Sequence, residues 1–317
     1  MKKLILIVVM AAFIALPVIF WASSLMSGVS WGVYLYAAGR ILGLVGFIFI
    51  FFQYVLSSRM KLIEKGIGLD GIFKIHKTCG LIGLSLVFIH PITFFIYDIV
   101  QGYDSPLSTL KIIGIITLFI IIVAAAFAML YRKLHLKYET WKNIHRISYV
   151  VLPMAFIHSL WLGSDLYSQP LRTFWWLLLS LYGVVIVYKL GNWIYIRRHP
   201  FKIAKVSQET HDTWSLYFEG RDLNYKPGQF LVINLVRDGK VSEAHPFTIS
   251  SSPTQDKLSI TVKSVGDFTS TVGETKTSDI AYIDAPYGVF SFLNYDDAQE
   301  LIFIAGGIGI TPFMSML

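Results

Sequence analysis

Six long apolar stretches constrain the fold of this chain more than any other feature of its sequence. They cover residues 4–22, 31–56, 73–97, 108–130, 141–162 and 172–196. A helix needs about 20 apolar residues to cross the hydrocarbon core of a bilayer. The chain is 55% hydrophobic and 15% charged, which is atypical of soluble domains. The sequence therefore predicts a multi-pass α-helical membrane domain of six spans within residues 1–199.

The charged residues predict the orientation of these spans. Up to Pro200 the chain has 18 Lys and Arg against 6 Asp and Glu, and after it 9 against 14. Basic residues among apolar spans indicate topology rather than an anionic partner, so we exclude nucleic acid and expect membrane lipid around this region. The connections 57–74 and 131–142 are basic, whereas 23–30 has no Lys or Arg. Their basic residues are Arg59, Lys61, Lys65 and Lys74, then Arg132, Lys133, Lys137 and Lys142. The positive-inside rule predicts a cell-membrane protein whose N-terminus and whose region after the last span are cytoplasmic.

The first apolar stretch follows two lysines and could be mistaken for a cleaved signal peptide. Its apolar run is longer than the core of about 7–15 residues that signal peptides have. We therefore expect a retained helix.

Four histidines lie inside the third and fifth stretches. His76 and His90 are 14 residues apart, a rise of roughly 21 Å along one helix face. His145 and His158 are 13 residues apart, a rise of roughly 19.5 Å. The two pairs match in height, but an ideal helix would leave the second pair about 140° apart in angle. We expect Pro153, which lies between them, to distort that helix.

Several kinds of site use intramembrane histidine. A single one is often a core residue bonded to a hydroxyl or carbonyl, but four at matched depths make that reading improbable. A proton relay would need carboxylates between the histidines, and these stretches have none there. A zinc or copper site would need clustered ligands, not two separate layers. Two b-type haems fit the pattern, with His76 and His145 as the inner metal ligands and His90 and His158 as the outer ones.

Arg40 is a charged residue inside the second stretch. It lies roughly 14 Å below the outer surface if the span is a regular helix. A charge at that depth needs a partner, unless the side chain snorkels to the interface.

Beyond Pro200 the hydropathy falls and the pattern changes to short alternating runs such as "TWSLYFE" and "KLSITVK". Such runs, broken by turns such as "YKPGQ", predict an antiparallel β-barrel or sandwich in residues 200–298. The last segment, 299–317, reads "LIFIAGGIGITPFMSML" from Leu301. It predicts a strand, a glycine turn and the start of a helix, which is how an α/β nucleotide-binding domain begins.

These motifs together resemble the ferric reductase and NADPH oxidase superfamily. The shared features are the spacings H-x13-H and H-x12-H, "HPFTISS" at 245–251, "VGDFT" at 265–269 and "APYG" at 285–288. By that resemblance Phe247 stacks on the FAD ring, Thr248 lies at its reactive edge and His245 lies near the pyrophosphate. The implied FAD-binding residues are His245, Pro246, Phe247, Thr248, Ser250, Lys263, Gly266 and Thr269.

The resemblance also implies a nicotinamide-nucleotide site, with Gly306, Gly307, Gly309 and Thr311 at the start of its domain. Each glycine motif taken alone is equally compatible with a tight turn. The chain ends at Leu317, a few residues into the expected helix. We therefore expect this NAD(P)H site to be incomplete unless a further domain or a second chain completes it.

The implied activity is transmembrane electron transfer. NAD(P)H would reduce FAD in the cytoplasm, and two haem b groups would carry electrons to an extracytoplasmic small-molecule acceptor. Three acceptors stay open: O2, giving superoxide; a ferric complex; or a partner protein. The resemblance places Arg40 near an outer haem propionate and Thr248 at the reactive edge of the flavin. Arg40 and Thr248 are therefore the candidate catalytic residues.

Overall fold

A computed structural model describes residues 2–25, 30–131, 133–136, 138–295 and 300–317. It contains two compact units, which are described here one at a time. The first unit comprises Met1–Met60 and Asp70–Val187, and the second comprises Lys61–Leu69 and Tyr188–Leu317. Two of the basic residues used to predict orientation, Arg132 and Lys137, lie outside the described residues, as does the domain boundary predicted between residues 298 and 299.

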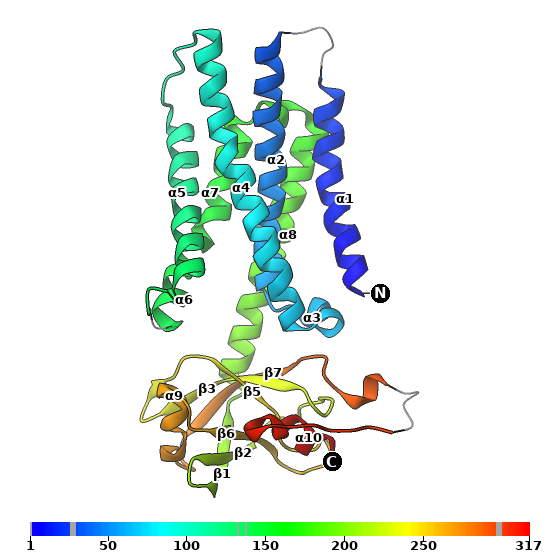
Figure 1. The fold of residues 1–317 in the computed structure, drawn as a ribbon, viewed down its shortest axis with the longest axis vertical. Helices are drawn as coiled ribbons and strands as arrows, with labels where there is room; N and C mark the ends of the chain where they lie inside the picture. The colour runs from blue at the N-terminus through cyan, green and yellow to red at the C-terminus, as the bar shows by residue number, and fades with distance from the viewer. Residues whose placement is uncertain (1, 26–29, 132, 137, 296–299) are drawn as a thin grey trace. The chain divides into compact units, whose positions relative to one another are not determined.

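The first unit is a bundle of helices that run side by side (Figure 1). Its elements are α1 (Lys2–Ser23), α2 (Trp31–Ser57), α4 (Leu69–Gln101), α5 (Thr109–Leu130), α6 (Tyr138–Arg146), the 3-10 turn η1 (Ile147–Val150), α7 (Val151–Leu162), the 3-10 turn η2 (Ser164–Tyr167) and the first part of α8 (Gln169–Arg198), whose residues from Tyr188 onward belong to the second unit. Within the described residues, five of these helices are long and apolar enough to cross a membrane: α1, α2, α4, α5 and α8.

The fifth predicted span, 141–162, is not one continuous helix. It is divided into α6, η1 and α7, and Pro153 lies in the first turn of α7. A proline has no N–H and its ring collides with the carbonyl four residues earlier, so a helix entering it from the N-terminal side cannot keep regular hydrogen bonds. The turn tightens at Ile147–Val150 instead. The distortion expected from Pro153 is therefore present, just before the proline.

Tyr54 of α2 satisfies backbone groups at this break. Its hydroxyl accepts a hydrogen bond from the N–H of Leu152 at 3.1 Å and donates one to the carbonyl of Ser148. In a bilayer no water can replace such bonds, so an interrupted helix needs a partner of this kind. A packed aromatic cluster lies deeper in the bundle, where Phe47 stacks on the fully buried Trp175 with ring centroids 5.0 Å apart.

Large apolar side chains cover the outside of the bundle. Ile19, Phe95 and Phe119 are each about two-thirds exposed, at 64%, 67% and 66%. An aqueous surface would disfavour so many exposed apolar groups, whereas lipid tails accept them. This exterior agrees with the membrane region predicted from the sequence.

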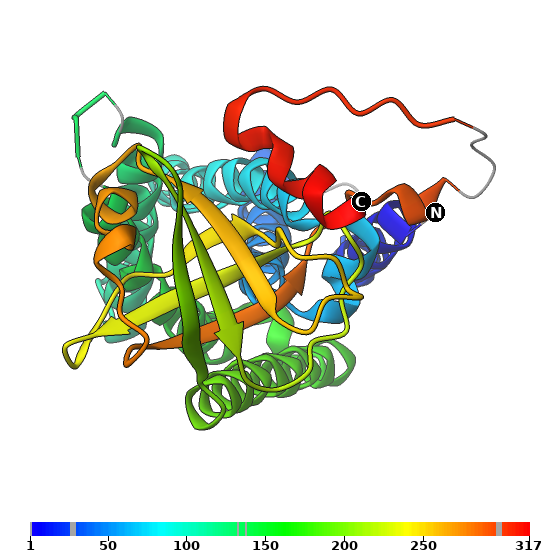
Figure 2. The same cartoon turned by 90° about the horizontal axis from the view of Figure 1, so that it is seen from below.

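The second unit is built on an antiparallel sheet with the strand order β4-β3-β7-β1-β2-β6, in which β5 also pairs with β3. The strands are β1 (Phe201–Thr210), β2 (Thr213–Glu219), β3 (Phe230–Arg237), β4 (Lys240–Val241), β5 (His245–Thr248), β6 (Leu258–Lys263) and β7 (Ile280–Tyr287). This confirms the antiparallel sheet predicted from the alternating runs. The sheet curls around a core that includes Leu216, Ile233 and Ile283 (Figure 2).

Short helices complete the second unit. They are α3 (Lys61–Ile67), α9 (Asp267–Ser270) and α10 (Thr311–Met316), with 3-10 turns η3 (Val272–Glu274), η4 (Phe292–Asn294) and η5 (Gly307–Ile310). The helix α3 packs on β7, although it lies between α2 and α4 in the sequence.

The sequence predicted a strand before the glycine turn, and for residues 300–306, which the structure describes, this prediction is wrong. That segment has no strand pairing and its side chains are exposed. Its apolar pattern suits a strand, but a strand exists only where a neighbour supplies hydrogen bonds. The predicted helix start at Thr311–Pro312 is present as α10, with the proline in its first turn.

Candidate functional site

The four histidines that were predicted to lie in the membrane form two facing pairs. His76 and His145 have ring centroids 6.3 Å apart with planes at 73°, and His90 and His158 have centroids 6.4 Å apart at 88°. His76 and His90 come from α4, His145 from α6 and His158 from α7. A metal ion accepts an imidazole nitrogen at about 2.0–2.1 Å, so two rings on opposite sides of one ion have centres roughly 6 to 6.5 Å apart. Both pairs have that spacing.

Backbone carbonyls orient three of these rings. Nδ1 of His90 lies 2.8 Å from the carbonyl oxygen of Gly39, and Nδ1 of His158 lies 2.8 Å from that of Leu110. Nδ1 of His145 lies 3.4 Å from the carbonyl oxygen of Ala124. A carbonyl can only accept, so Nδ1 carries the proton and Nε2 keeps its lone pair. This is how proteins prepare a histidine to bind a metal.

Glycines make room for the outer pair. A Cβ on Gly43 would lie 2.6 Å from Cε1 of His90, and a Cβ on Gly114 would lie 2.6 Å from Cε1 of His158. Each glycine comes four residues after the carbonyl that accepts from the same histidine, Gly39 and Leu110 respectively. A side chain at the i+4 position covers the turn that precedes it, so any larger residue would block the imidazole. The same local arrangement therefore occurs in both α2 and α5.

The inner pair has an aromatic neighbour that the sequence prediction missed. Trp141 stacks on His145 with centroids 5.8 Å apart and planes at 23°, and Tyr131 stacks on Trp141 at 5.0 Å and 24°. Trp141 lies four residues before His145 on the same helix. That spacing puts two side chains on one face, which is the signal that could have revealed it.

No group of three or more His, Cys, Asp or Glu side chains that could hold a metal ion is present in the part of the chain that the structure describes. Each histidine pair supplies only two protein ligands. Two opposed imidazoles suit an iron whose other four positions are filled by a porphyrin. The residues at both pairs therefore fit haem, and the donor set does not resemble a structural zinc site.

Arg40 is paired with an acidic residue. Its Nε donates to Oδ2 of Asp165 at 2.8 Å, and its Nη2 donates to Oδ1 of the same carboxylate. Nη2 also donates to Oγ of Ser24 at 2.9 Å. Asp165 lies in η2, a connection without periodicity, so no sequence signal pointed to it. The partner that a charge at this depth requires is thus a side chain of the chain itself, and the haem-propionate role stays a prediction.

The predicted flavin motif forms β5 of the second unit. Its backbone pairs with β3, so that Phe247 is opposite Leu231 and Thr248 is opposite Phe230. Phe268 stacks on His245 with centroids 3.9 Å apart and planes at 16°, and it lies 6.1 Å from the ring of Phe247. Two predicted segments, 245–251 and 265–269, therefore meet through Phe268. This residue was not among the predicted site residues, although it stands inside "VGDFT".

The hydroxyl of Thr269 organises the second of these segments. It accepts from the N–H groups of Val265 and Gly266, both at 2.9 Å. No atom would lie within 4 Å of a Cβ on Gly266, so this turn is open to solvent. The amides and the hydroxyl of this turn thus bond to each other, and its binding of a phosphate stays a prediction.

Other predicted flavin residues lie around the sheet. Pro246 is exposed in β5 opposite Val232. Ser250 exchanges a hydrogen bond with Oγ of Ser259 at 2.9 Å. Nζ of Lys263 lies 3.3 Å from a carboxylate oxygen of Asp212. The hydrogen bond from Thr210, followed by those from Lys263 and Thr213, holds the pKa of Asp212 below its ordinary value.

The predicted nucleotide turn is exposed. Gly306, Gly307 and Gly309 have open space around them, and Gly307 has φ +52°, which favours glycine. Thr311 is buried and donates to the carbonyl of Ile308 at 3.1 Å. Gly307 and Gly309 thus lie in the turn η5, Gly306 directly precedes it, and Thr311 is the first residue of α10.

Comparisons with known proteins match both units. Residues 42–156 match the family described as ferric reductase like transmembrane component, and residues 198–291 match a family of FAD-binding domains. Together these matches cover three of the four histidines, His76, His90 and His145, and all eight predicted flavin residues.

Individual relatives are oxidases and reductases. The chain is 41% identical over 109 residues to ferric reduction oxidase 8 of Arabidopsis thaliana, which covers 30% of this chain and 14% of that protein. It is 26% identical over 218 residues to dual oxidase 2 of Rattus norvegicus, covering 64% of this chain and 14% of that protein. It is 35% identical over 126 residues to the glycine betaine monooxygenase reductase subunit of Pseudomonas aeruginosa, covering 38% and 34%.

The chain spans between about one seventh and one third of the length of these relatives. The order of the two matched regions, a ferric reductase-like membrane component and then an FAD-binding domain, agrees with the bundle and the sheet. A region similar to the ferric reductase like transmembrane component is thus followed by a region similar to FAD-binding domains, and this order matches that of the ferric reductase and NADPH oxidase superfamily.

Proposed function

We propose that this chain passes electrons from cytoplasmic NAD(P)H, through FAD and two b-type haems, to an extracytoplasmic acceptor, which is O2 reduced to superoxide. The observation that carries the proposal is the pair of facing imidazoles at each of two levels, with centroids 6.3 and 6.4 Å apart. The family match to an FAD-binding domain supports the flavin. The dual oxidase relative supports oxygen as acceptor.

The proposal includes the topology. We take α6, η1 and α7 together as a sixth crossing, which puts the N-terminus and the sheet unit on the cytoplasmic side of the cell membrane. The basic connections on that side support this orientation. We also take the sheet as a closed barrel, because an isolated bridge pairs Ile249, just after β5, with Ile260 of β6.

The residues have distinct roles in this proposal. When bound, FAD converts a hydride into single electrons and the haems carry them one at a time. His76 with His145, and His90 with His158, would each hold one haem, and two histidine ligands would favour electron transfer over oxygen binding at iron. Phe247 would lie on the flavin ring and Thr248 at its reactive edge.

The other predicted binding residues hold the ends of the two nucleotides. His245, Pro246, Ser250, Lys263, Gly266 and Thr269 would hold the rest of FAD, and Gly306, Gly307, Gly309 and Thr311 the nicotinamide nucleotide. Glycine turns let backbone N–H groups approach a phosphate closely.

Two other acceptors remain candidates because specific relatives favour them. The identity of 41% with a ferric reduction oxidase favours a ferric complex, and the match to a monooxygenase reductase subunit favours a partner protein. A superoxide trap and a ferric-chelator assay distinguish the first two acceptors. A requirement for a second polypeptide would indicate the third.

The decisive experiment replaces the histidines one at a time with leucine. Purified wild-type chain should hold two haems, and each of His76→Leu, His145→Leu, His90→Leu and His158→Leu should lose one, because a single imidazole binds haem iron weakly. His211→Leu is the matched control, since its side chain is 91% exposed in the second unit. Haem content by the pyridine haemochrome method decides the outcome. One haem or none in the wild type, or no change across the four variants, would contradict the proposal.

A further inference from the structure

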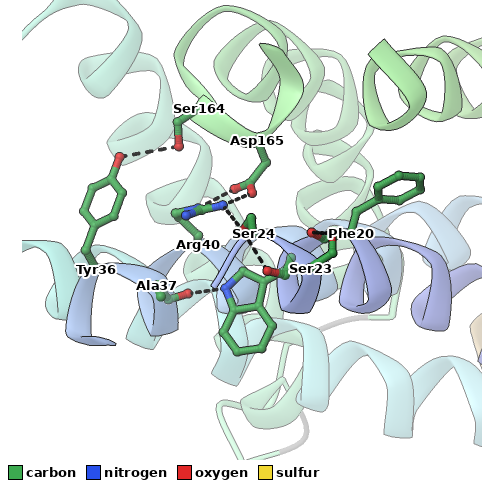
Figure 3. Close-up of polar contacts among 9 residues, drawn as sticks. Phe20, Ser23, Ser24, Tyr36, Ala37, Arg40, Ser164 and Asp165 are labelled. Atoms are coloured by element: carbon green, nitrogen blue, oxygen red, sulfur yellow. Dashed lines mark hydrogen bonds and ion pairs between the residues drawn. The ribbon is translucent and has the colours of Figure 1, made fainter. Parts of the chain in front are cut away.

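The ion pair between Arg40 and Asp165 is a built feature of the first unit (Figure 3). Two nitrogens of the guanidinium bond to the two carboxylate oxygens, and a third bond joins Nη2 to Ser24. The side chains are only 19% and 9% exposed. Bidentate arginine–carboxylate pairs are strong and directional. The two charges therefore neutralise each other at close range.

This pair lies next to the outer histidines. The carbonyl of Gly39, the residue before Arg40, accepts the hydrogen bond from Nδ1 of His90. One turn earlier on α2, Tyr36 packs on Phe94, and Phe94 contacts the ring of His90 with centroids 5.1 Å apart. The ion pair is thus connected to His90, one of the two outer histidines, through contacts made by residues within one turn of α2.

A small cavity opens beside the guanidinium. Its volume is about 130 Å³, and Ser24, Tyr36 and Arg40 are among the residues that line it. Pockets for drug-sized ligands have volumes of about 300–1,000 Å³. A ferric chelate with its organic ligands belongs to that size class, whereas a diatomic molecule fits easily in the smaller space.

We propose that Asp165 determines the specificity for the electron acceptor, by neutralising Arg40 so that a small uncharged molecule, dioxygen, is favoured over anionic ferric chelates. This inference rests on the proposed function, since it concerns the acceptor of the outer histidine level. An unpaired guanidinium would attract polyanions and would also retain an anionic product. The paired guanidinium does neither. Each electron transfer reduces one O2 to one superoxide, which is released, and consumes no proton.

The experiment uses the whole chain, reduced chemically and freed of excess reductant under anaerobic conditions. Stopped-flow absorbance follows haem reoxidation by three oxidants: O2, the trianion ferricyanide and the trication hexaammineruthenium(III). In Asp165→Asn, at low salt, the ferricyanide rate should rise and the hexaammineruthenium rate should fall, each by roughly tenfold, because one uncompensated charge then acts on a trivalent ion. The O2 rate should change by less than about twofold, because O2 carries no charge.

Three further variants separate charge from structure. Asp165→Glu keeps the charge and should keep the wild-type ratio of the two ionic rates. The double variant Arg40→Gln with Asp165→Asn removes both charges and should return that ratio toward wild type, as a double-mutant cycle requires. Asp104→Asn removes an exposed carboxylate from the connection between α4 and α5 and should leave the ratio unchanged.

Haem content and absorption spectra are measured on every sample, so two kinds of failure are distinguishable. If Asp165→Asn holds two haems and its reoxidation rates with ferricyanide and hexaammineruthenium(III) equal those of the wild type, the inference is overturned while the proposed function stands. An unchanged salt dependence of the ferricyanide rate in that variant overturns it as well. A wild-type chain that binds no haem overturns both. If Asp165→Asn does not fold, the double variant and Asp165→Glu decide, and a changed ratio in either overturns the inference.

Discussion

Trp141 stacks on the imidazole of His145 with ring centroids 5.8 Å apart and an interplanar angle of 23°. The indole therefore restricts the rotation of the ring that we propose as an inner haem ligand. Such a contact differs from the outer pair, where carbonyls at 2.8 Å orient the rings. At His145 the corresponding carbonyl is more distant, at 3.4 Å. Stacking and a long hydrogen bond together hold the inner ring.

Replacing Trp141 should change the inner haem and leave the outer one intact. Aromatic pairs contribute about 0.5–1.5 kcal/mol, so Trp141→Leu should move the inner midpoint potential by roughly 20–65 mV. Trp141→Phe keeps a stacked ring and should move it less. Spectroelectrochemical titration measures both potentials, and low-temperature EPR reports the relative orientation of the axial imidazoles. Identical spectra and potentials in Trp141→Leu and the wild type would show that the indole has no positioning role.

The glycines beside the outer histidines give a second prediction. An alanine Cβ at position 43 would lie 2.6 Å from His90, and at position 114 the same distance from His158. Overpacking of this kind costs about 1–3 kcal/mol, so Gly43→Ala and Gly114→Ala should each weaken outer haem binding by roughly 5- to 150-fold. Gly183→Ala is the control, because no atom of its surroundings lies within 4 Å of the new Cβ. Haem content after purification is the readout. A full complement of haem in both variants would mean that the imidazoles can move aside.

The sequence predicted which of the four histidines face each other but not how their rings meet. Depth follows from the fixed rise of a helix, so His76 and His145 could be matched by counting residues. Angle depends on where the helix through His158 breaks, and η1 is positioned by Pro153 together with Tyr54 from another helix. Such a tertiary contact has no trace in local periodicity.

Loops and unpaired segments limited the rest of the prediction. Asp165 comes from a connection, where no periodic pattern identifies the residue that will face Arg40. The apolar run at 300–306 resembles a strand, yet strand formation depends on a neighbour that local sequence does not specify. By contrast, the strands β1, β2, β3 and β6 followed directly from alternation, because one face of each packs on the shared core.

The flavin site gives a third prediction. Phe247→Ala combined with Thr248→Ala removes a ring and a hydroxyl from β5, which together contribute about 1–3 kcal/mol to a stacked, hydrogen-bonded ligand. FAD affinity should fall by roughly 5- to 150-fold. Haem absorption should stay unchanged, because the histidines belong to the other unit. Val241→Ala, on the exposed strand β4, is the control. Flavin fluorescence and haem absorbance of one sample measure both, and joint loss of the two cofactors would contradict the assignment of separate sites.

The last prediction concerns Glu64, a buried carboxylate on α3 that is 1% exposed. Its Oε1 accepts the N–H of Gly288 at 2.6 Å, and the carbonyl of Gly288 in turn accepts from Nε2 of Gln229 at 2.8 Å. Gly288 has φ +98°, so this turn at the end of "APYG" has a conformation that few other residues adopt. On the same helix, Nζ of Lys61 donates to the carbonyl of Pro286 at 2.9 Å. The short helix α3 thus fixes the turn that follows β7.

Glu64→Ala should destabilise the sheet unit by about 1–3 kcal/mol, since the partly buried N–H of Gly288 then loses the carboxylate acceptor that the structure gives it. Glu64→Gln keeps an oxygen acceptor and should lose less. Leu62→Ala, at a side chain that is 84% exposed on the same helix, should change the free energy of unfolding by less than about 0.5 kcal/mol. Denaturant titration followed by flavin fluorescence on the whole chain measures all three variants. If Glu64→Ala unfolds at the same denaturant concentration as Leu62→Ala, the bond between Glu64 and Gly288 does not stabilise the sheet unit, and α3 must be held by its other contacts to β7.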